Sequence, residues 1–229
     1  LHIDYKIGHY VKIIMDEIFG EKNFRNDIAR IKCNPKNFSR KGYGNIKDMI
    51  LFYSKTDNFF WNEPRQPYTD GEIKRLFPKI DSSGRCYTTT PLHAPGVTQN
   101  GDTGKPWRDM LPPTGRHWRY APSVLDKLDL QGLIEWSKTG NPRKIIYADE
   151  QGARGKLRQD IWEFKDPQHP QYPTEKNLQL LKTIIKASSQ DNSMVLDCFC
   201  GSGTTLAAAQ ECGRNWIGID KSKIAQKHL

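Results

Sequence analysis

The chain has 229 residues and carries 35 Lys and Arg against 26 Asp and Glu, which gives a formal net charge of +9. This excess of positive charge favours a polyanionic partner, and nucleic acid fits it best. No apolar run approaches the length of a membrane span and no signal-peptide pattern opens the chain, so we expect a cytoplasmic protein without membrane contact. The cysteines include no Cys-x-x-Cys pair, which supports neither a disulfide framework nor a metal site.

The first 57 residues have the pattern of alternating strand and helix. Residues 1–5 alternate apolar and polar side chains, which predicts a strand. The segment that follows carries apolar side chains at positions 7, 10, 11, 14 and 18, which predicts a helix ended by Gly20. Residues 49–53 form a continuous apolar run, which is typical of a strand in a central sheet.

A basic segment lies between these elements. Residues 28–47 contain six basic and no acidic side chains, interleaved with glycine, asparagine and proline. This composition predicts a loop, and a loop of this kind is suited to lie along the phosphates of a nucleic acid. We expect Arg40 and Lys41 to bind DNA, against the alternative of an ordinary solvated loop.

Residues 58–170 lose this periodicity and become rich in proline, which predicts an inserted, loop-rich module. Its arginines are grouped with aromatic residues, and arginine can hold phosphates or read base edges. For the tryptophans we favour a role in the core. The expected small helical core consists of Val124, Leu125, Leu128, Leu130, Leu133 and Ile134. The expected DNA-binding residues of the module are Arg116, Arg119, Arg143 and Lys144.

The last segment carries the most specific pattern of the chain. An amphipathic helix is predicted over residues 174–187, and a short apolar run then ends at Asp197, as a buried strand of a parallel sheet would. Gly201 and Gly203 allow a tight turn before a second helix. A further apolar run ends at Asp220, near the spacing at which an acid meets ribose hydroxyls in nucleotide-binding units.

The ligand of this unit follows by elimination. No lysine lies between Lys186 and Lys221, so a triphosphate lacks its counter-charge, and Leu206 stands where a dinucleotide fingerprint has its third glycine. Asp197 suits a cationic amino group and Asp220 suits a ribose, and S-adenosylmethionine has both groups. The alternative is an ordinary strand-turn-helix without a ligand.

Three segments carry a resemblance to one family. The run Asp-Cys-Phe-Cys-Gly-Ser-Gly-Thr-Thr at 197–205 resembles the Asp-Pro-Phe-x-Gly-Ser-Gly-Thr-Thr signature of bacterial DNA amino-methyltransferases. Tyr-Pro-Thr-Glu-Lys-Asn-Leu at 172–178 is similar to the His-Pro-Thr-Gln-Lys-Pro-Leu segment of their circularly permuted beta class, typical of type III and many type II systems. Residues 1–27 resemble the segment after the catalytic strand. The departures are Cys198 for proline, Tyr172 for histidine, Glu175 for glutamine and Asn177 for proline.

The resemblance implies an α/β fold: an incomplete Rossmann-like sheet of an S-adenosylmethionine-dependent methyltransferase with an inserted target-recognition domain. The core then comprises residues 1–57 and 171–229, and the recognition domain comprises residues 58–170. It also implies a set of residues that bind S-adenosylmethionine, with the methionine end of the cofactor at the last two: Asp197, Phe199, Gly201, Gly203, Thr204, Asp220, Thr174 and Lys176.

The family transfers a methyl group to an exocyclic amino group of a flipped base in duplex DNA, and we expect adenine N6 first and cytosine N4 second. Its catalytic Asp/Asn/Ser-Pro-Pro-aromatic tetrapeptide has no counterpart here, because Leu-Pro-Pro-Thr at 111–114 lacks both the polar residue and the ring. We therefore assign no catalytic residue and expect a fragment that is inactive alone. Competing interpretations are an RNA or small-molecule methyltransferase and a non-catalytic DNA-binding specificity subunit. The resemblance leaves open a homodimer or a restriction-subunit partner.

Overall fold

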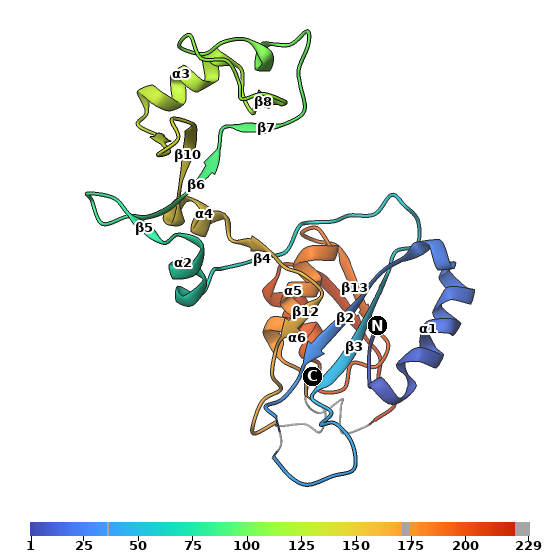
Figure 1. Ribbon diagram of the computed structural model, residues 1–229. Coiled ribbons are helices and arrows are strands. Elements are labelled where there is room, and N and C mark those ends of the chain that lie inside the picture. Colours follow the sequence, from blue (N-terminus) through green and yellow to red (C-terminus); the bar gives the residue numbers. More distant parts are fainter. Residues whose placement is uncertain (36, 171–174, 223–229) are drawn as a thin grey trace. The chain divides into compact units, whose positions relative to one another are not determined.

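The structure of the protein is a computed structural model that describes residues 1–35, 37–170 and 175–222 (Figure 1). The chain forms two compact units, the first comprising Leu1–Pro64 with Leu157–Leu229 and the second Arg65–Lys156. These limits differ from the expected insert at 58–170, because the return segment after residue 157 belongs to the first unit. β4 (Arg65–Gln66) pairs with β11 (Lys156–Leu157) where the chain passes between the units.

The first unit contains a four-stranded sheet in the order β1-β3-β2-β12. Its strands are β1 (His2–Ile3), β2 (Phe24–Ile31), β3 (Lys47–Tyr53) and β12 (Ile161–Glu163). β3 is antiparallel to both β1 and β2, whereas β12 is parallel to β2. The apolar run at 49–53 is the centre of this sheet, with Met49, Ile50 and Leu51 all buried, so the strand prediction is confirmed.

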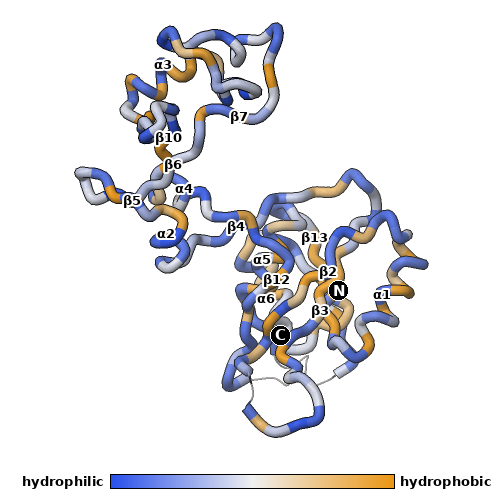
Figure 2. The backbone as a smooth tube through the Cα atoms, viewed as in Figure 1, coloured by the Kyte–Doolittle hydropathy of each residue, from blue (hydrophilic) through white to orange (hydrophobic). Residues whose placement is uncertain are grey.

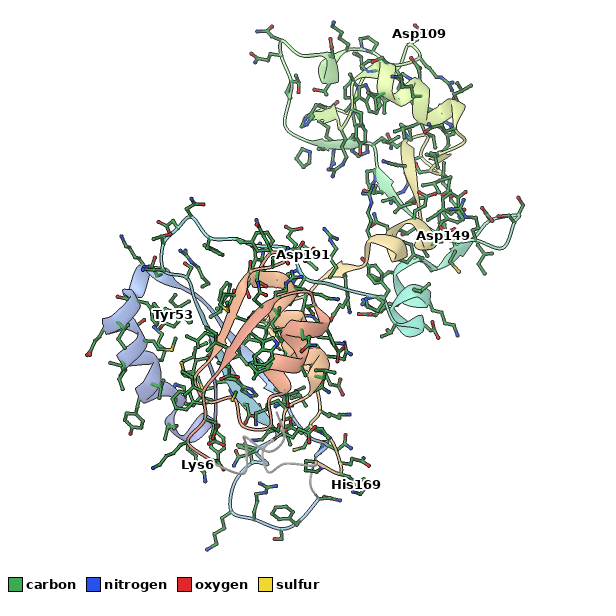
Figure 3. The ribbon with its side chains drawn as sticks, turned by 180° about the vertical axis from the view of Figure 1, so that it is seen from behind. Lys6, Tyr53, Asp109, Asp149, His169 and Asp191 are labelled. Carbon is green, nitrogen blue, oxygen red and sulfur yellow. The ribbon has the colours of Figure 1, made fainter. Side chains whose placement is uncertain are left out.

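Helix α1 (Tyr5–Phe19) begins where Asp4 accepts a hydrogen bond from the Lys6 amide and ends at Gly20, as predicted; a 3-10 turn, η1 (Glu21–Asn23), follows. The helix approaches β3 closely at Gly8, where a Cβ atom would lie 2.5 Å from the Met49 sulfur. The Tyr53 hydroxyl, labelled in Figure 3, donates to Asp16 at 2.7 Å.

The apolar stripe of α1 is exposed. Hydrophobic residues recur along this helix in Figure 2. Because the helix packs through glycine and polar groups, the amphipathic pattern does not identify its buried face. The exposed side chains are Ile7, Tyr10, Ile13, Ile14, Ile18 and Phe19.

The basic segment begins inside β2, which corrects the loop predicted to start at residue 28. Arg30 is fully buried, and its Nε donates to the Phe164 carbonyl at 2.8 Å. Its guanidinium also forms ion pairs with Asp48 and Asp166. Lys32 lies 2.6 Å from Asp48. These two cations therefore stabilise the sheet, and the loop is confined to residues after them.

The last segment of the first unit forms a strand-helix-strand unit preceded by a helix. α5 (Leu178–Ser188) is capped by Asn177 and begins four residues later than predicted. It is followed by β13 (Met194–Asp197), α6 (Thr204–Glu211) and β14 (Asn215–Gly218), and the two strands are parallel. The expected α/β fold with parallel strands is thus present here.

The two sides of β13 have different environments. Val195 packs with Ala208, Ala209 and other apolar residues of α5 and α6. Met194 and Leu196 are about 60% exposed on the opposite side. The prediction of a buried strand is therefore wrong for that side, because the helices α5 and α6 contact only the Val195 side.

The second unit combines a four-stranded antiparallel sheet with a hairpin and short helices. The sheet has the order β5-β6-β10-β9, and the hairpin is β7-β8. The sheet strands are β5 (Lys79–Ile80), β6 (Cys86–Pro91), β9 (Ile134–Trp136) and β10 (Pro142–Tyr147). The remaining elements are α2 (Asp70–Leu76), β7 (His93–Pro95), η2 (Asp102–Gly104), β8 (Arg116–Trp118), α3 (Pro122–Leu130) and α4 (Ala148–Arg154).

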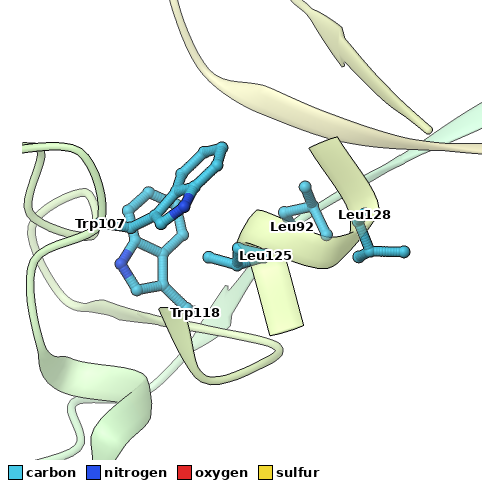
Figure 4. Packing of buried hydrophobic residues seen from close by; sticks show 5 residues of the cluster. All are labelled: Leu92, Trp107, Trp118, Leu125 and Leu128. Carbon is cyan, nitrogen blue, oxygen red and sulfur yellow. The ribbon is translucent and has the colours of Figure 1, made fainter. Parts of the chain in front are cut away.

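The core of the second unit is built around two tryptophans that pack against α3 and the β6-β7 junction (Figure 4). Trp107 and Trp118 are almost completely buried, which confirms the core role expected for tryptophan at these positions. Leu125 and Leu128 are also buried, whereas Leu130 is 91% exposed and Val124 is exposed, so the predicted helical core is only partly correct.

Candidate functional site

The turn after β13 requires glycine at two positions. Gly201 has φ 54° and Gly203 has φ 79°, in the left-handed region that residues with a Cβ atom rarely adopt. The turn is closed by a hydrogen bond from the Gly203 amide to the Cys200 carbonyl at 2.8 Å. Asp197 accepts the Phe199 amide at 3.0 Å, so the end of the strand fixes the start of the turn.

Asp220 holds the same turn from the other strand. One carboxylate oxygen accepts the Gly201 amide at 2.8 Å, and the other accepts the Ser222 amide at 2.8 Å. These hydrogen bonds, that from Ser222 first, lower the pKa of Asp220 below its ordinary value. Asp220 is therefore ionised at neutral pH and organises the turn, a contact that the spacing of the two acids did not predict.

Strand β14 approaches helix α6 and the turn after β13 closely at Gly218. A Cβ atom on Gly218 would lie 2.4 Å from Leu206 Cδ1 and 3.1 Å from the Cys200 sulfur. Leu206 is buried, although it occupies the position of a fingerprint's third glycine. Here the strand, and not the helix, carries the glycine that permits close packing.

A pocket lies beside this turn. Five residues expected to bind the cofactor line it: Lys176, Asp197, Phe199, Gly201 and Thr204. Four further residues line the pocket without having been predicted, although the last three lie within the signature: Leu181, Cys200, Ser202 and Thr205. Gly203 and Asp220 are not among its lining residues, and Thr174 lies outside the described residues.

The pocket places opposite charges next to an aromatic ring. It is lined by the basic residue Lys176, the acidic residue Asp197 and the aromatic residue Phe199, and Phe199 is 85% exposed. Burial first, and then the charges of Asp197 and Asp220, raise the pKa of the Cys200 thiol. Cys200 therefore remains protonated at neutral pH and is not a nucleophile. Such a pocket suits a ligand with an ammonium group, a carboxylate and a flat ring.

The predicted DNA-binding residues of the second unit are engaged in contacts within the unit. Arg143 donates to the Thr89 hydroxyl and carbonyl, each at 2.8 Å. Arg119 donates to the Pro91 carbonyl at 3.0 Å, and the Lys144 ammonium lies 5.3 Å from the Tyr120 ring centre. The structure therefore gives Arg143 a structural role, and its contact with DNA stays a prediction.

Arg116 makes a contact that the sequence did not predict. Its Nη1 lies 3.2 Å from Nδ1 of His93, on the neighbouring strand of the hairpin. The charges of Arg116, Arg119 and Arg143 all act on this histidine. His93 was missed because a single histidine after a strand carries no local signal.

The two residues of the first unit that are expected to bind DNA, Arg40 and Lys41, both lie in the loop after β2. The guanidinium of Arg40 lies 4.3 Å from the centre of the Phe38 ring, and Lys41 is exposed. Asn45 at the end of this loop donates to the Tyr5 hydroxyl at 2.7 Å. Within the described ranges, no three His, Cys, Asp or Glu side chains are arranged to hold a metal ion, and no helix is long and apolar enough to cross a membrane.

Comparison with known proteins identifies the family of the chain. A family model described as DNA methylase matches residues 1–228. The chain is 44% identical to the type II methyltransferase M.EcaI of Enterobacter cloacae, over 99% of this chain and 51% of that protein. It is 41% identical to the type II methyltransferase M1.MboII of Moraxella bovis, over 86% of this chain and 57% of that protein. The chain thus spans about half the length of these curated relatives.

Among solved structures, the crystal structure of an M1.HpyAVI-SAM complex is similar to this chain with a TM-score of 0.47 and 18% identity. The match covers 98% of this chain and 68% of that one.

Proposed function

The chain belongs to the DNA methylase family, and we propose that it serves the transfer of a methyl group from S-adenosylmethionine to an exocyclic amino group of a base in duplex DNA. The observation that carries this proposal is the pocket after β13, where Lys176 and Asp197 lie on one surface with Phe199. The proposal extends to a cytoplasmic enzyme of DNA modification or restriction-modification.

The residues of the pocket fit this cofactor by their chemistry. The methionine end of S-adenosylmethionine carries an ammonium group and a carboxylate, which match Asp197 and Lys176 respectively. The exposed ring of Phe199 offers an apolar surface for the adenine. Each oxygen of Asp220 accepts one amide, and its remaining lone pairs can accept ribose hydroxyls. When bound, the cofactor supplies an electrophilic methyl group.

Cofactor binding is tested by isothermal titration of the 229-residue chain with S-adenosylmethionine. Asp197→Asn keeps an acceptor for the Phe199 amide but removes the charge that attracts the ammonium group, so we expect about tenfold weaker binding. Glu163→Gln, an exposed acid on β12, is the matched control. Equal affinity of the Asp197 variant and the control would contradict the assignment of Asp197.

Within this activity we propose adenine N6 as the target and cytosine N4 as the second choice. The 229 residues contain no tetrapeptide of the catalytic type, so we propose that they bind cofactor and DNA without turnover. Incubation with S-adenosylmethionine labelled in its methyl group and duplex DNA, followed by analysis of the nucleosides, tests both points. Label in N6-methyladenine would support adenine N6 as the target. It would also contradict the proposal that the 229-residue chain is inactive.

Duplex DNA is the proposed partner, with Arg40, Lys41, Arg116, Arg119 and the neighbouring Lys144 as contacts. This rests on the net charge of +9 and on the exposure of Lys41 and Arg116. Competition between duplex DNA and single-stranded RNA distinguishes this proposal from an RNA methyltransferase, because preference for the RNA would contradict it. A homodimer or a restriction subunit is a further proposed partner.

A further inference from the structure

His93 lies close to three arginines of the second unit, Arg116, Arg119 and Arg143. It opens β7, directly after Leu92, whose amide donates to the Pro142 carbonyl and whose carbonyl accepts the Arg119 amide. The side chain of Arg119 donates to the preceding residue, Pro91. The backbone that carries His93 is therefore fixed from both sides, and this position is rigid.

The contact between His93 and Arg116 determines the proton on the imidazole ring. A guanidinium group has only donors, so Arg116 Nη1 at 3.2 Å is a hydrogen-bond donor to Nδ1 of His93. Nδ1 must then lack a proton, and His93 is neutral with its proton on Nε2. Protonation of Nδ1 would replace this hydrogen bond by contact between two cations.

The surrounding charges also favour the neutral ring. Burial lowers the pKa of His93, and Arg116, Arg119 and Arg143 lower it further. Arg116 belongs to β8, Arg119 follows it, and Arg143 belongs to β10. The acid opposite Arg143 on β9 is Glu135, which is held by Lys79 and by the Tyr87 hydroxyl.

A phosphate oxygen placed between His93 and Arg116 would favour the protonated imidazole over the neutral one. A phosphodiester is an anion without a donor, so it stabilises a protonated imidazole beside it and accepts hydrogen bonds from a guanidinium. In its presence Arg116 no longer needs the imidazole as an acceptor. The proton that binds to Nδ1 comes from the solvent.

We propose that His93 and Arg116 form a binding site for a phosphodiester group of DNA, at which His93 takes up one proton and Arg116 transfers its hydrogen bond from the imidazole to the phosphate. The ligand rests on the proposed function, whereas the coupling between the two side chains rests on their geometry. DNA binding by this unit is then stronger at lower pH, because His93 takes up a proton when DNA binds.

The test measures the affinity of the full 229-residue chain for a fluorescent DNA duplex between pH 8 and pH 6 at fixed salt. Uptake of one proton increases affinity by up to about tenfold per pH unit. We expect affinity to rise about tenfold over this range, and His93→Gln to remove most of the rise. His117→Gln is the matched control, because His117 lies on the same hairpin and its Nδ1 donates to the Gly96 carbonyl instead.

A second measurement needs no variant. Titration of the histidine ring signals by NMR should show a pKa of His93 that rises when the duplex is added. If DNA binds but the His93→Gln chain keeps the full pH dependence, or the ring does not change its pKa, this inference is wrong and the proposed function stands. If the chain binds no DNA at either pH, both fail.

Discussion

The carboxylate of Asp220 accepts the amide of Gly201 at 2.8 Å, so the residue that ends the second parallel strand also fixes the glycine turn that follows the first. The two residues are 19 positions apart. The strand ladder continues into the same region, because the Ile219 amide donates to the Asp197 carbonyl at 2.8 Å. Asp197 and the turn consequently form one wall of the candidate cofactor pocket, and Asp220 holds this turn by its hydrogen bond to Gly201.

Replacement of Asp220 tests this coupling. Asp220→Ala leaves the Gly201 and Ser222 amides without their acceptor, and the turn loses its support from β14. We expect S-adenosylmethionine to bind about tenfold more weakly by isothermal titration. Asp220→Asn retains one acceptor oxygen, so we expect its affinity to lie between those of the unchanged chain and of Asp220→Ala. An unchanged affinity in Asp220→Ala would show that the turn keeps its form without the carboxylate.

Gly218 tests the packing of β14 on α6. An alanine Cβ would lie 2.4 Å from Leu206 Cδ1, so Gly218→Ala forces the buried Leu206 side chain to shift. We expect the free energy of unfolding to fall by about 1–3 kcal/mol in chemical denaturation followed by circular dichroism. Gly71→Ala is the control, because a Cβ there meets nothing within 4 Å. Equal stability of the two variants would contradict the described packing.

Asp48 makes the stability of the first unit depend on pH in the acid range. Burial raises its pKa, but hydrogen bonds from His2 and Lys32 outweigh this and lower the pKa from 3.8 to about 2. A lowered pKa stabilises the fold at pH values above 4, and this contribution is lost as the pH falls towards 2. The contribution is about 2 kcal/mol.

The corresponding experiment measures the free energy of unfolding between pH 6 and pH 2. Asp48→Asn should reduce the loss of stability in acid, because it removes the group that takes up the proton. Asp27→Asn serves as the control, since Asp27 is exposed on the same strand as Arg30. An acid dependence that Asp48→Asn leaves unchanged would assign this contribution to other carboxylates.

The tryptophans of the second unit differ in their expected contributions. Trp118 is fully buried and donates to the Lys105 carbonyl, so Trp118→Ala should cost about 3–5 kcal/mol of unfolding free energy. Trp136 is 42% exposed and stacks on Trp107 with ring centres 5.8 Å apart. We expect Trp136→Ala to cost only about 1 kcal/mol. A similar loss in both variants, measured by denaturation, would contradict this difference.

Local patterns in the sequence predicted the elements of the cofactor segment well. The apolar run at 194–196, the two glycines and the helix after them are adjacent in the chain, and each has a distinct backbone requirement. Only glycine adopts the positive φ of Gly201 and Gly203 at low cost, so the turn could be recognised without a tertiary structure. The order of strand, turn, helix and strand then predicted the parallel pair.

The same patterns failed where burial depends on a distant partner. The apolar stripe of α1 predicts an amphipathic helix that buries this stripe. Instead, the helix contacts β3 through Gly8 and through the hydrogen bond between Asp16 and Tyr53. Likewise, the composition around Arg30 predicts a basic loop, whereas pairing of β2 with β3 and β12 places its side chain in the interior. Neither helix periodicity nor local charge contains information about the partner of a side chain.

The sequence by itself determined the family resemblance, the glycine turn after Asp197 and the excess of positive charge. These depend on residue type and on spacing along the chain. The tertiary structure alone decided which charges are used inside the protein and which face outward. Arg30 meets Asp166 across 136 positions, and His93 meets Arg116 across 23. Such contacts arise from strand pairing that joins distant segments, so hydrogen-bond partners and the protonation state of His93 follow from the fold.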